Sequence, residues 1–170
     1  MNLQRLLSVV VCAFALAGCA SYRWSSSVPE DMRTVSVPTF ANGSSILSFG
    51  TTAATQLARE VQRDGTFRLA RPDDAALEIQ GEILSAGSGG SLGNRRMRNR
   101  LIECVLTAKV RVSVVDRRRG KVLIDNRVYE PSTTYVANGE LISFERDASA
   151  RLAEELAREV VDDLVSYNWK

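Results

Sequence analysis

Alternation of apolar and polar residues along most of Leu101–Asp116 is the feature that most constrains the fold. One set of alternate positions is apolar: Cys104, Leu106, Ala108, Val110, Val112 and Val114. The other set is largely polar: Glu103, Thr107, Lys109, Arg111 and Ser113. Because successive side chains of a β-strand point to opposite faces, the segment predicts a long strand with one buried and one solvated face. Arg117–Gly120 then predicts a hairpin turn with Gly120 in the left-handed position, and Lys121–Tyr129 predicts the returning strand.

Three other segments predict strands nearer the N-terminus. Arg33–Phe40 is typical of a strand, and Pro38 indicates a sheet edge or a strand end because proline lacks the N–H donor. Ala41–Ser45 predicts a turn. Phe67–Ala70 predicts a short strand, and Ala76–Ala86 predicts a strand because its apolar and charged residues alternate. We expect Pro131–Leu141 to be a loop.

Two segments have the four-residue apolar spacing of an amphipathic helix. The first, Ser48–Arg63, carries its stripe on Phe49, Ala53, Leu57 and Val61, and we expect it to end at Asp64-Gly65. The second, Glu145–Tyr167, carries an apolar seam. The seam residues are Ala148, Leu152, Leu156, Val160 and Leu164. Ser143 is the expected N-cap.

These elements predict one α+β domain built as a two-layer sandwich. Two helices with one apolar stripe each can cover one face of a sheet and leave the other face polar. We therefore expect a mostly antiparallel sheet of about four strands, with both helices packed on one face.

The N-terminus indicates a secreted, lipid-anchored protein. Arg5 precedes an apolar run, Leu6–Leu16, which is too short to span a bilayer but has the length of a signal-peptide core. The run ends in Leu16-Ala17-Gly18-Cys19, which resembles the lipobox of bacterial lipoproteins. We therefore expect residues 1–18 to be a cleaved signal peptide, 19–31 a lipidated tether and 32–170 a single globular domain.

The lipobox resemblance implies acyl chains, including palmitate, on Cys19. Two or more chains give a stable membrane anchor, whereas one chain binds reversibly. Ala20 and Ser21 follow the cysteine, and the sorting rule of proteobacterial lipoproteins implies the outer membrane where no aspartate stands at that point. We expect a protein on the periplasmic side of the outer membrane of a Gram-negative cell.

Composition argues against an enzyme. The sequence contains no histidine, the commonest general base and metal ligand. Gly87–Gly93 is glycine-rich but joins two expected strands and lacks the Lys-Ser/Thr of a nucleotide site. Cys104 lies on the apolar face of its strand, where we expect it to be a packing residue. A net charge of +2 does not indicate a nucleic-acid partner. We expect no catalytic residue, metal or cofactor.

Two arginine clusters are the candidate binding sites. Arg95, Arg96, Arg98 and Arg100 surround Met97 between the two long strands, and arginine forks beside an apolar residue suit an anionic amphiphile. A solvated loop is the alternative for this cluster. Arg117, Arg118, Arg119 and Lys121 at the hairpin are weaker candidates, for which simple solvation is the favoured interpretation.

The mature chain resembles the lipopolysaccharide-assembly lipoprotein family, LptE. The resemblance rests on Tyr22-Arg23-Trp24 after Cys19, on MRTVSVPTFANGS, on RDGTFRLARPDDAALEIQGEI, on KVRVSVVDRRRGKVLIDNRV and on the long C-terminal helix. It implies a plug for the lipopolysaccharide-export β-barrel LptD, with polar faces toward the lumen. It also implies that basic residues at loop ends bind lipopolysaccharide, which here points to Arg95, Arg96, Arg98 and Arg100.

A second interpretation remains open, because fold does not decide function. Periplasmic lipoproteins that activate cell-wall synthases or that form part of secretion assemblies also begin with a Val-x-Val-x-x-Phe strand followed by a helix. In such a protein the basic loop would contact a protein partner or peptidoglycan.

Overall fold

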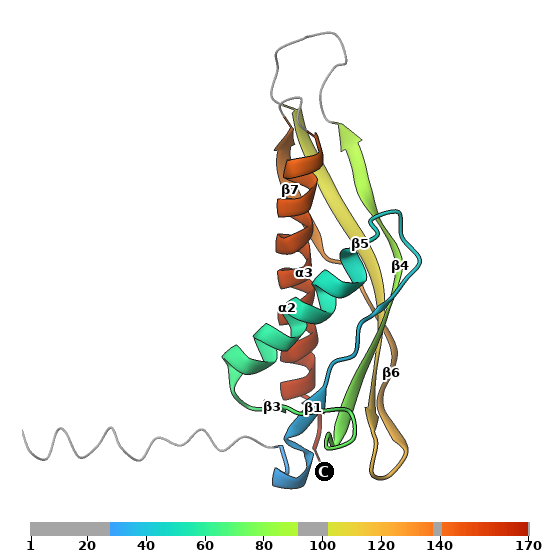
Figure 1. Ribbon diagram of the computed structural model, residues 1–170, viewed down its shortest axis with the longest axis vertical. Coiled ribbons are helices and arrows are strands. Elements are labelled where there is room, and N and C mark those ends of the chain that lie inside the picture. Colours follow the sequence, from blue (N-terminus) through green and yellow to red (C-terminus); the bar gives the residue numbers. More distant parts are fainter. Residues whose placement is uncertain (1–27, 92–101, 138–140, 170) are drawn as a thin grey trace, which may run out of the picture.

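The computed structural model describes residues 28–91, 102–137 and 141–169. The elements in chain order are η2 (Glu30–Met32), β1 (Thr34–Ser36), β2 (Ala41–Asn42), α2 (Phe49–Asp64), β3 (Arg68–Leu69), β4 (Leu77–Ser91), β5 (Ile102–Asp116), β6 (Lys121–Tyr129), β7 (Ser132–Ala137) and α3 (Leu141–Val165). Figure 1 shows an elongated molecule in which both helices lie on one side of a twisted sheet. The expected α+β class, with two helices on one face, is confirmed.

The sheet is mixed and has more strands than the sequence predicted. The described strands form a seven-stranded sheet in the order β3-β1-β4-β5-β6, with β2 also beside β4 and β7 also beside β5. β1 runs parallel to both β3 and β4, and β2 runs parallel to β4, whereas β5 is antiparallel to β4, β6 and β7. The prediction of about four mostly antiparallel strands is therefore wrong in strand number and misses the parallel pairs.

Short strands account for these errors. The expected strand Arg33–Phe40 is shortened to β1, because the chain leaves the sheet before Pro38. It returns as β2 at Ala41, where we expected a turn. Proline cannot donate to the ladder, which explains the break. β7 lies in the expected loop Pro131–Leu141, and its residues pair with the first half of β5.

Two long elements extend beyond their expected bounds. β4 continues through the glycine-rich segment to Ser91, where we expected a loop, because the ladder with β5 continues as far as the Ser91–Cys104 pair. α3 begins at Leu141, so Ser143 lies inside the helix and is not its N-cap. The other strands and the first helix match their predictions closely, and α2 ends at Asp64 with Gly65 as its left-handed C-cap, at φ 76°.

The core lies between the sheet and the helices. The α2 stripe is buried, with Phe49, Ala53 and Val61 at 0% exposure. The α3 seam is buried as well: Leu152 and Leu164 both have 0% exposure. These stripes meet Val110, Val112 and Val114 from the apolar side of β5, among other residues of one contiguous cluster. The sequence periodicity thus correctly identified the face of each element that packs.

Gly81 makes room for an aromatic ring in this core. A Cβ atom on Gly81 would lie 2.2 Å from a ring carbon of Phe40, which is far inside van der Waals contact. Phe40 itself is 3% exposed. The absence of a side chain at Gly81 therefore lets the ring pack directly on the backbone of β4 between Ile79 and Ile83, both fully buried.

Candidate functional site

The helices leave the other side of the sheet uncovered, and this open face carries charged pairs with a few valines. Its residues are Glu78, Gln80, Glu82, Lys109, Arg111, Arg117, Val122 and Val128. They fall on one side because β4, β5 and β6 alternate in register over the same stretch. The expectation of a polar second face is met by these strands.

Cross-strand ion pairs organise the open face. Arg111 contacts Glu82 at 2.8 Å, and Lys109 contacts Glu130 at 2.8 Å. Arg117 pairs with Glu78 at the hairpin end. The Gln80 amide donates to Glu78 at 2.8 Å, and this hydrogen bond, with the Arg117 guanidinium, holds the pKa of Glu78 below its usual range. The more exposed pairs, Arg111–Glu82 and Lys109–Glu130, contribute only about 0–1 kcal/mol each to stability.

Two valines interrupt the charges on the open face. Val122 is 46% exposed and Val128 is 43% exposed. Val128 lies opposite Arg111 across the β5–β6 ladder, and Val122 lies opposite Val115. The open face therefore has charged side chains that could form ion pairs with a partner, and exposed valines whose burial would be favourable. This combination suits contact with another polar protein surface.

Some of the hairpin arginines form hydrogen bonds and ion pairs within the fold. The buried carboxylate of Asp116 accepts hydrogen bonds from the backbone N–H groups of Arg118 and Arg119, at 2.9 and 3.0 Å. The Arg119 guanidinium contacts Asp116 at 3.5 Å and Asp31 at 3.4 Å. Gly120 has φ 64°, which confirms the expected left-handed turn residue. Within the described part of the chain, the side chains of Arg118 and Lys121 have no ion-pair partner.

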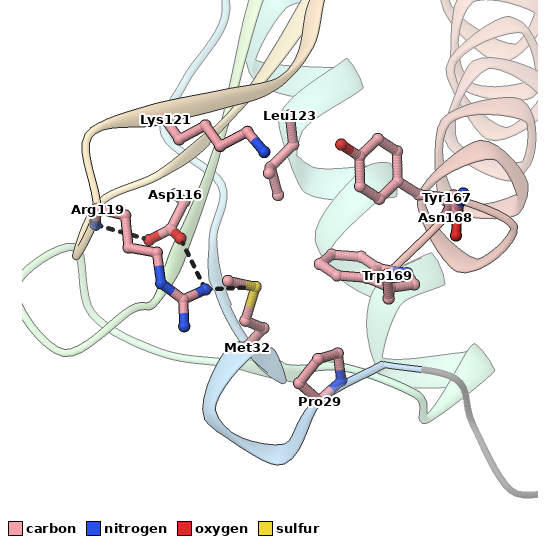
Figure 2. Close-up of a pocket in the computed structure, with 9 residues that line it drawn as sticks. All are labelled: Pro29, Met32, Asp116, Arg119, Lys121, Leu123, Tyr167, Asn168 and Trp169. Atoms are coloured by element: carbon pink, nitrogen blue, oxygen red, sulfur yellow. Dashed lines mark hydrogen bonds and ion pairs between the residues drawn. The ribbon is translucent and has the colours of Figure 1, made fainter.

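A cleft of about 360 Å³ opens beside this hairpin (Figure 2). Its lining residues are Pro29, Met32, Asp116, Arg119, Lys121, Leu123, Tyr167, Asn168 and Trp169. Sequence reasoning did not find it, because three distant segments form it: the turn before β1, the β5–β6 hairpin and the residues after α3. The aromatic pair Tyr167 and Trp169, just beyond the helical seam, was the available signal.

A partly buried polar cluster of Arg127, Tyr129 and Asp163 ties β6 to α3. The Tyr129 hydroxyl donates to Asp163 Oδ2 at 2.7 Å, and Arg127 Nε contacts the same oxygen at 2.9 Å. Burial, reinforced by the hydrogen bond to the Asp163 carboxylate, raises the pKa of Tyr129 well above its usual value. Since the carboxylate is satisfied from both sides, this cluster fastens the edge strand to the helix.

Comparison with known proteins establishes the family. The sequence model of the LptE family, described as lipopolysaccharide-assembly, matches residues 32–164. The chain belongs to the LptE family. The match covers every described strand and almost all of α3, and it confirms the resemblance seen in the sequence. No curated protein matches the chain.

Solved structures share the fold of this LptE-family chain at low identity. A minor lipoprotein from Acinetobacter baumannii is 14% identical with a TM-score of 0.51, covering 79% of this chain and 94% of that one. The protein CT253 from Chlamydia trachomatis is 15% identical with a TM-score of 0.55, covering 79% and 96%. The protein XCC0632 from Xanthomonas campestris is 7% identical with a TM-score of 0.50, covering 79% and 84%. At these identities the likeness concerns the fold alone.

Several sequence-based site predictions for this LptE-family chain lie outside the described residues. They are the lipid acceptor Cys19 and the first basic cluster, Arg95, Arg96, Met97, Arg98 and Arg100. The ends of the strands that flank this cluster, Ser91 and Ile102, lie at the opposite end of the sheet from the hairpin (Figure 1). Only these strand ends are placed relative to the hairpin, since residues 92–101 lie outside the described ranges.

Cys104 contacts the hydrophobic core. Cys104 is half-buried, packs against the core and lies opposite Tyr135 in the β5–β7 ladder.

In residues 28–91, 102–137 and 141–169, no group of acidic, cysteine or histidine side chains could hold a metal ion. No helix in these ranges is both long and apolar enough to cross a membrane.

Proposed function

We propose that this LptE-family chain is an outer-membrane lipoprotein that plugs and helps to assemble an LptD-like β-barrel. It also binds lipopolysaccharide during insertion of that lipid into the outer membrane, and it acts without catalysis or a cofactor. The match of the family model to residues 32–164 is the observation that carries the proposal. A covalent lipid on Cys19 would hold the chain on the periplasmic side of the membrane.

The open face supports the barrel partnership. Its ion pairs, such as Glu82–Arg111 and Lys109–Glu130, lie at 41–65% side-chain exposure and add little to folding. Complementary charges at an interface favour specificity and rapid association more than affinity. A surface of this kind fits the polar lumen of a barrel, and it is the face that we place against the barrel wall.

Co-purification tests the partnership directly. Tagged full-length chain is recovered from detergent-solubilised outer membranes, and the bound proteins are identified by mass spectrometry. We expect a large β-barrel protein in near-equal amount. The matched control is Cys19→Ala, which should lose lipid labelling and reach the outer membrane poorly. Recovery of a cell-wall synthase or a secretion component in place of a barrel would contradict the proposal and favour the alternative class of envelope scaffold.

The lipopolysaccharide site is tested by comparing the two basic clusters. Charge-assisted contacts contribute about 1.5–3 kcal/mol each when desolvated, so replacing Arg95, Arg96, Arg98 and Arg100 by alanine should weaken binding far more than tenfold. Replacing Arg117, Arg118 and Arg119 should have a smaller effect on binding, although the loss of two ion-paired guanidiniums should lower stability. Binding of lipopolysaccharide to both folded full-length variants is measured at two salt concentrations. Unchanged binding by the first variant would overturn the assignment.

A further inference from the structure

The cleft beside the hairpin has the composition of a site for an anionic amphiphile. Its lining is mixed: Met32, Leu123 and Trp169 supply apolar surface, while Lys121 contributes an ammonium group beside the Asp116–Arg119 pair. Figure 2 shows Lys121 and Leu123 on one side and Tyr167 and Trp169 on the other, with Met32 and Pro29 below them in this view. A cavity of this size, apolar with a few polar groups, is typical of small-ligand sites.

One cation of the cleft lining, Lys121, is not neutralised by an ion pair within the described residues. The single carboxylate of the lining, Asp116, accepts two backbone N–H groups and contacts Arg119. Arg119 is further paired with Asp31. Lys121 has no ion-pair partner among the described residues, and it is exposed. The cleft therefore offers one free cation beside apolar and aromatic surface.

The aromatic wall is held in place and is only partly covered. The Trp169 indole N–H donates to the Leu164 carbonyl at 3.1 Å. The Trp169 ring packs on Phe67 and on Tyr167, with centroids 5.9 and 5.2 Å apart. Trp169 and Tyr167 are each partly buried against the core and partly exposed. Tryptophan and tyrosine favour membrane–water boundaries, because one end of the ring is apolar and the other is polar.

The position of the tether limits how far this cleft can lie from a bilayer. Pro29 lines the cleft, and the Val28 carbonyl accepts a hydrogen bond from Arg33 at 3.2 Å, so the described chain begins beside the cleft. From Cys19 to Val28 the chain can extend at most roughly 30 Å, at ~3.5 Å per residue. A lipid on Cys19 therefore keeps the cleft close to the membrane surface.

We propose that this cleft docks on the bilayer by receiving an anionic phospholipid headgroup, with Lys121 facing the phosphate and Trp169 and Tyr167 at the interface. The inference rests on the proposed lipid anchor at Cys19 but on neither the barrel nor lipopolysaccharide. It concerns the membrane that holds the protein, whereas the residue 95–100 cluster was predicted to bind the cargo. Docking would fix the orientation of the open face relative to the membrane.

Fluorescence of Trp169 in vesicles tests this inference. The chain has two tryptophans, so Trp24→Phe leaves Trp169 as the only one. The full-length lipidated protein is reconstituted into phosphatidylcholine vesicles with and without phosphatidylglycerol, and quenching by neutral acrylamide is measured. We expect phosphatidylglycerol to shield Trp169. Lys121→Glu should reduce the docked population about fivefold or more, the factor corresponding to ~1 kcal/mol per basic residue at an anionic surface.

Arg151→Glu is the matched control, because Arg151 is exposed on α3 far from the cleft and changes the net charge equally. Lys121→Gln, a milder change, should reduce the shielding in the same direction if Lys121→Glu disturbs the fold. Equal quenching in both kinds of vesicle, or equal behaviour of Lys121→Glu and Arg151→Glu, would overturn the proposal. So would shielding of the detergent-solubilised protein by glycerol 3-phosphate alone, which would indicate a site for a free phosphate.

The assay separates failure of this inference from failure of the proposed function. It contains no lipopolysaccharide and no barrel, so a negative result leaves the co-purification experiment independent. Flotation with pure phosphatidylcholine vesicles checks the anchor itself. Protein that does not float lacks the lipid on which the inference depends, and the inference then fails with it.

Discussion

The two faces of the sheet differ in how their side chains are satisfied. On the covered face, Leu106, Val110 and Val114 have 0% exposure and belong to the hydrophobic core. On the open face, Glu82 and Arg111 keep 50% and 41% exposure and pair with one another. The covered face is removed from water on folding, whereas the open face remains available for a second surface. Burial of the covered face supplies the stability, and we propose that the open face on the opposite side of the same strands recognises the partner.

The largest expected effect is on the covered face. Leu156→Ala should lower the free energy of unfolding by about 2–5 kcal/mol, because the side chain is 2% exposed and its removal leaves a cavity under the sheet. Urea titration of the purified full-length protein measures the change. A loss below about 1 kcal/mol would mean that this side of α3 does not form the core.

Overpacking should also destabilise the covered face. Gly81→Val places a side chain where the Phe40 ring lies, and relieving that overlap should lower the free energy of unfolding by about 1–3 kcal/mol. The double change Gly81→Val, Phe40→Ala should be less than additive, since removing the ring makes space for the valine. Strict additivity in urea titrations would show that the two positions are not in contact.

Tyr129→Phe should have an intermediate effect with a pH signature. Removing the hydroxyl deletes the bond to Asp163 and should lower stability by about 1 kcal/mol at neutral pH. Because the folded state raises the pKa of this phenol, the stabilisation is complete below about pH 10 and is lost as pH rises above that value. The urea midpoint should decrease more between pH 8 and pH 11 for the wild type than for Tyr129→Phe. Tyr167→Phe is the control, and an identical slope in Tyr129→Phe would refute the assignment.

The smallest effect is expected on the open face. Glu82→Ala should change the free energy of unfolding by less than about 1 kcal/mol, because the ion pair is exposed. A double-mutant cycle with Arg111→Ala isolates the interaction, which should fall between about 0.2 and 1 kcal/mol. A coupling as large as the Leu156→Ala loss would remove the distinction between the two faces.

Periodicity predicted the long elements well and the short ones poorly. Helix α2, strand β5 and the buried side of each could be read from the spacing of their apolar residues, because one face of each packs on the core. β2 has two residues and β3 has two, too few for a period. β7 was missed because Pro131 and a polar start suggested a loop, although pairing with β5 supplies its hydrogen bonds.

The candidate sites divide in the same way. The polar side of β5 was evident, but the pairing of Arg111 with Glu82 depends on strand register, which no single segment reveals. The cleft joins Met32, Leu123 and Trp169, which only tertiary structure brings together. The role of the residue 95–100 cluster remains a prediction, since it lies outside the described residues.

Photocrosslinking from the open face tests the central proposal most directly. A photoreactive phenylalanine derivative replaces Gln80 in the full-length chain in living cells, and Arg151 on the outward side of α3 is replaced in a parallel strain. We predict an ultraviolet-dependent adduct from position 80 with a large outer-membrane β-barrel protein, and a weaker one from position 151. No barrel adduct from position 80 at normal protein levels, or an adduct with a cell-wall synthase instead, would contradict the account.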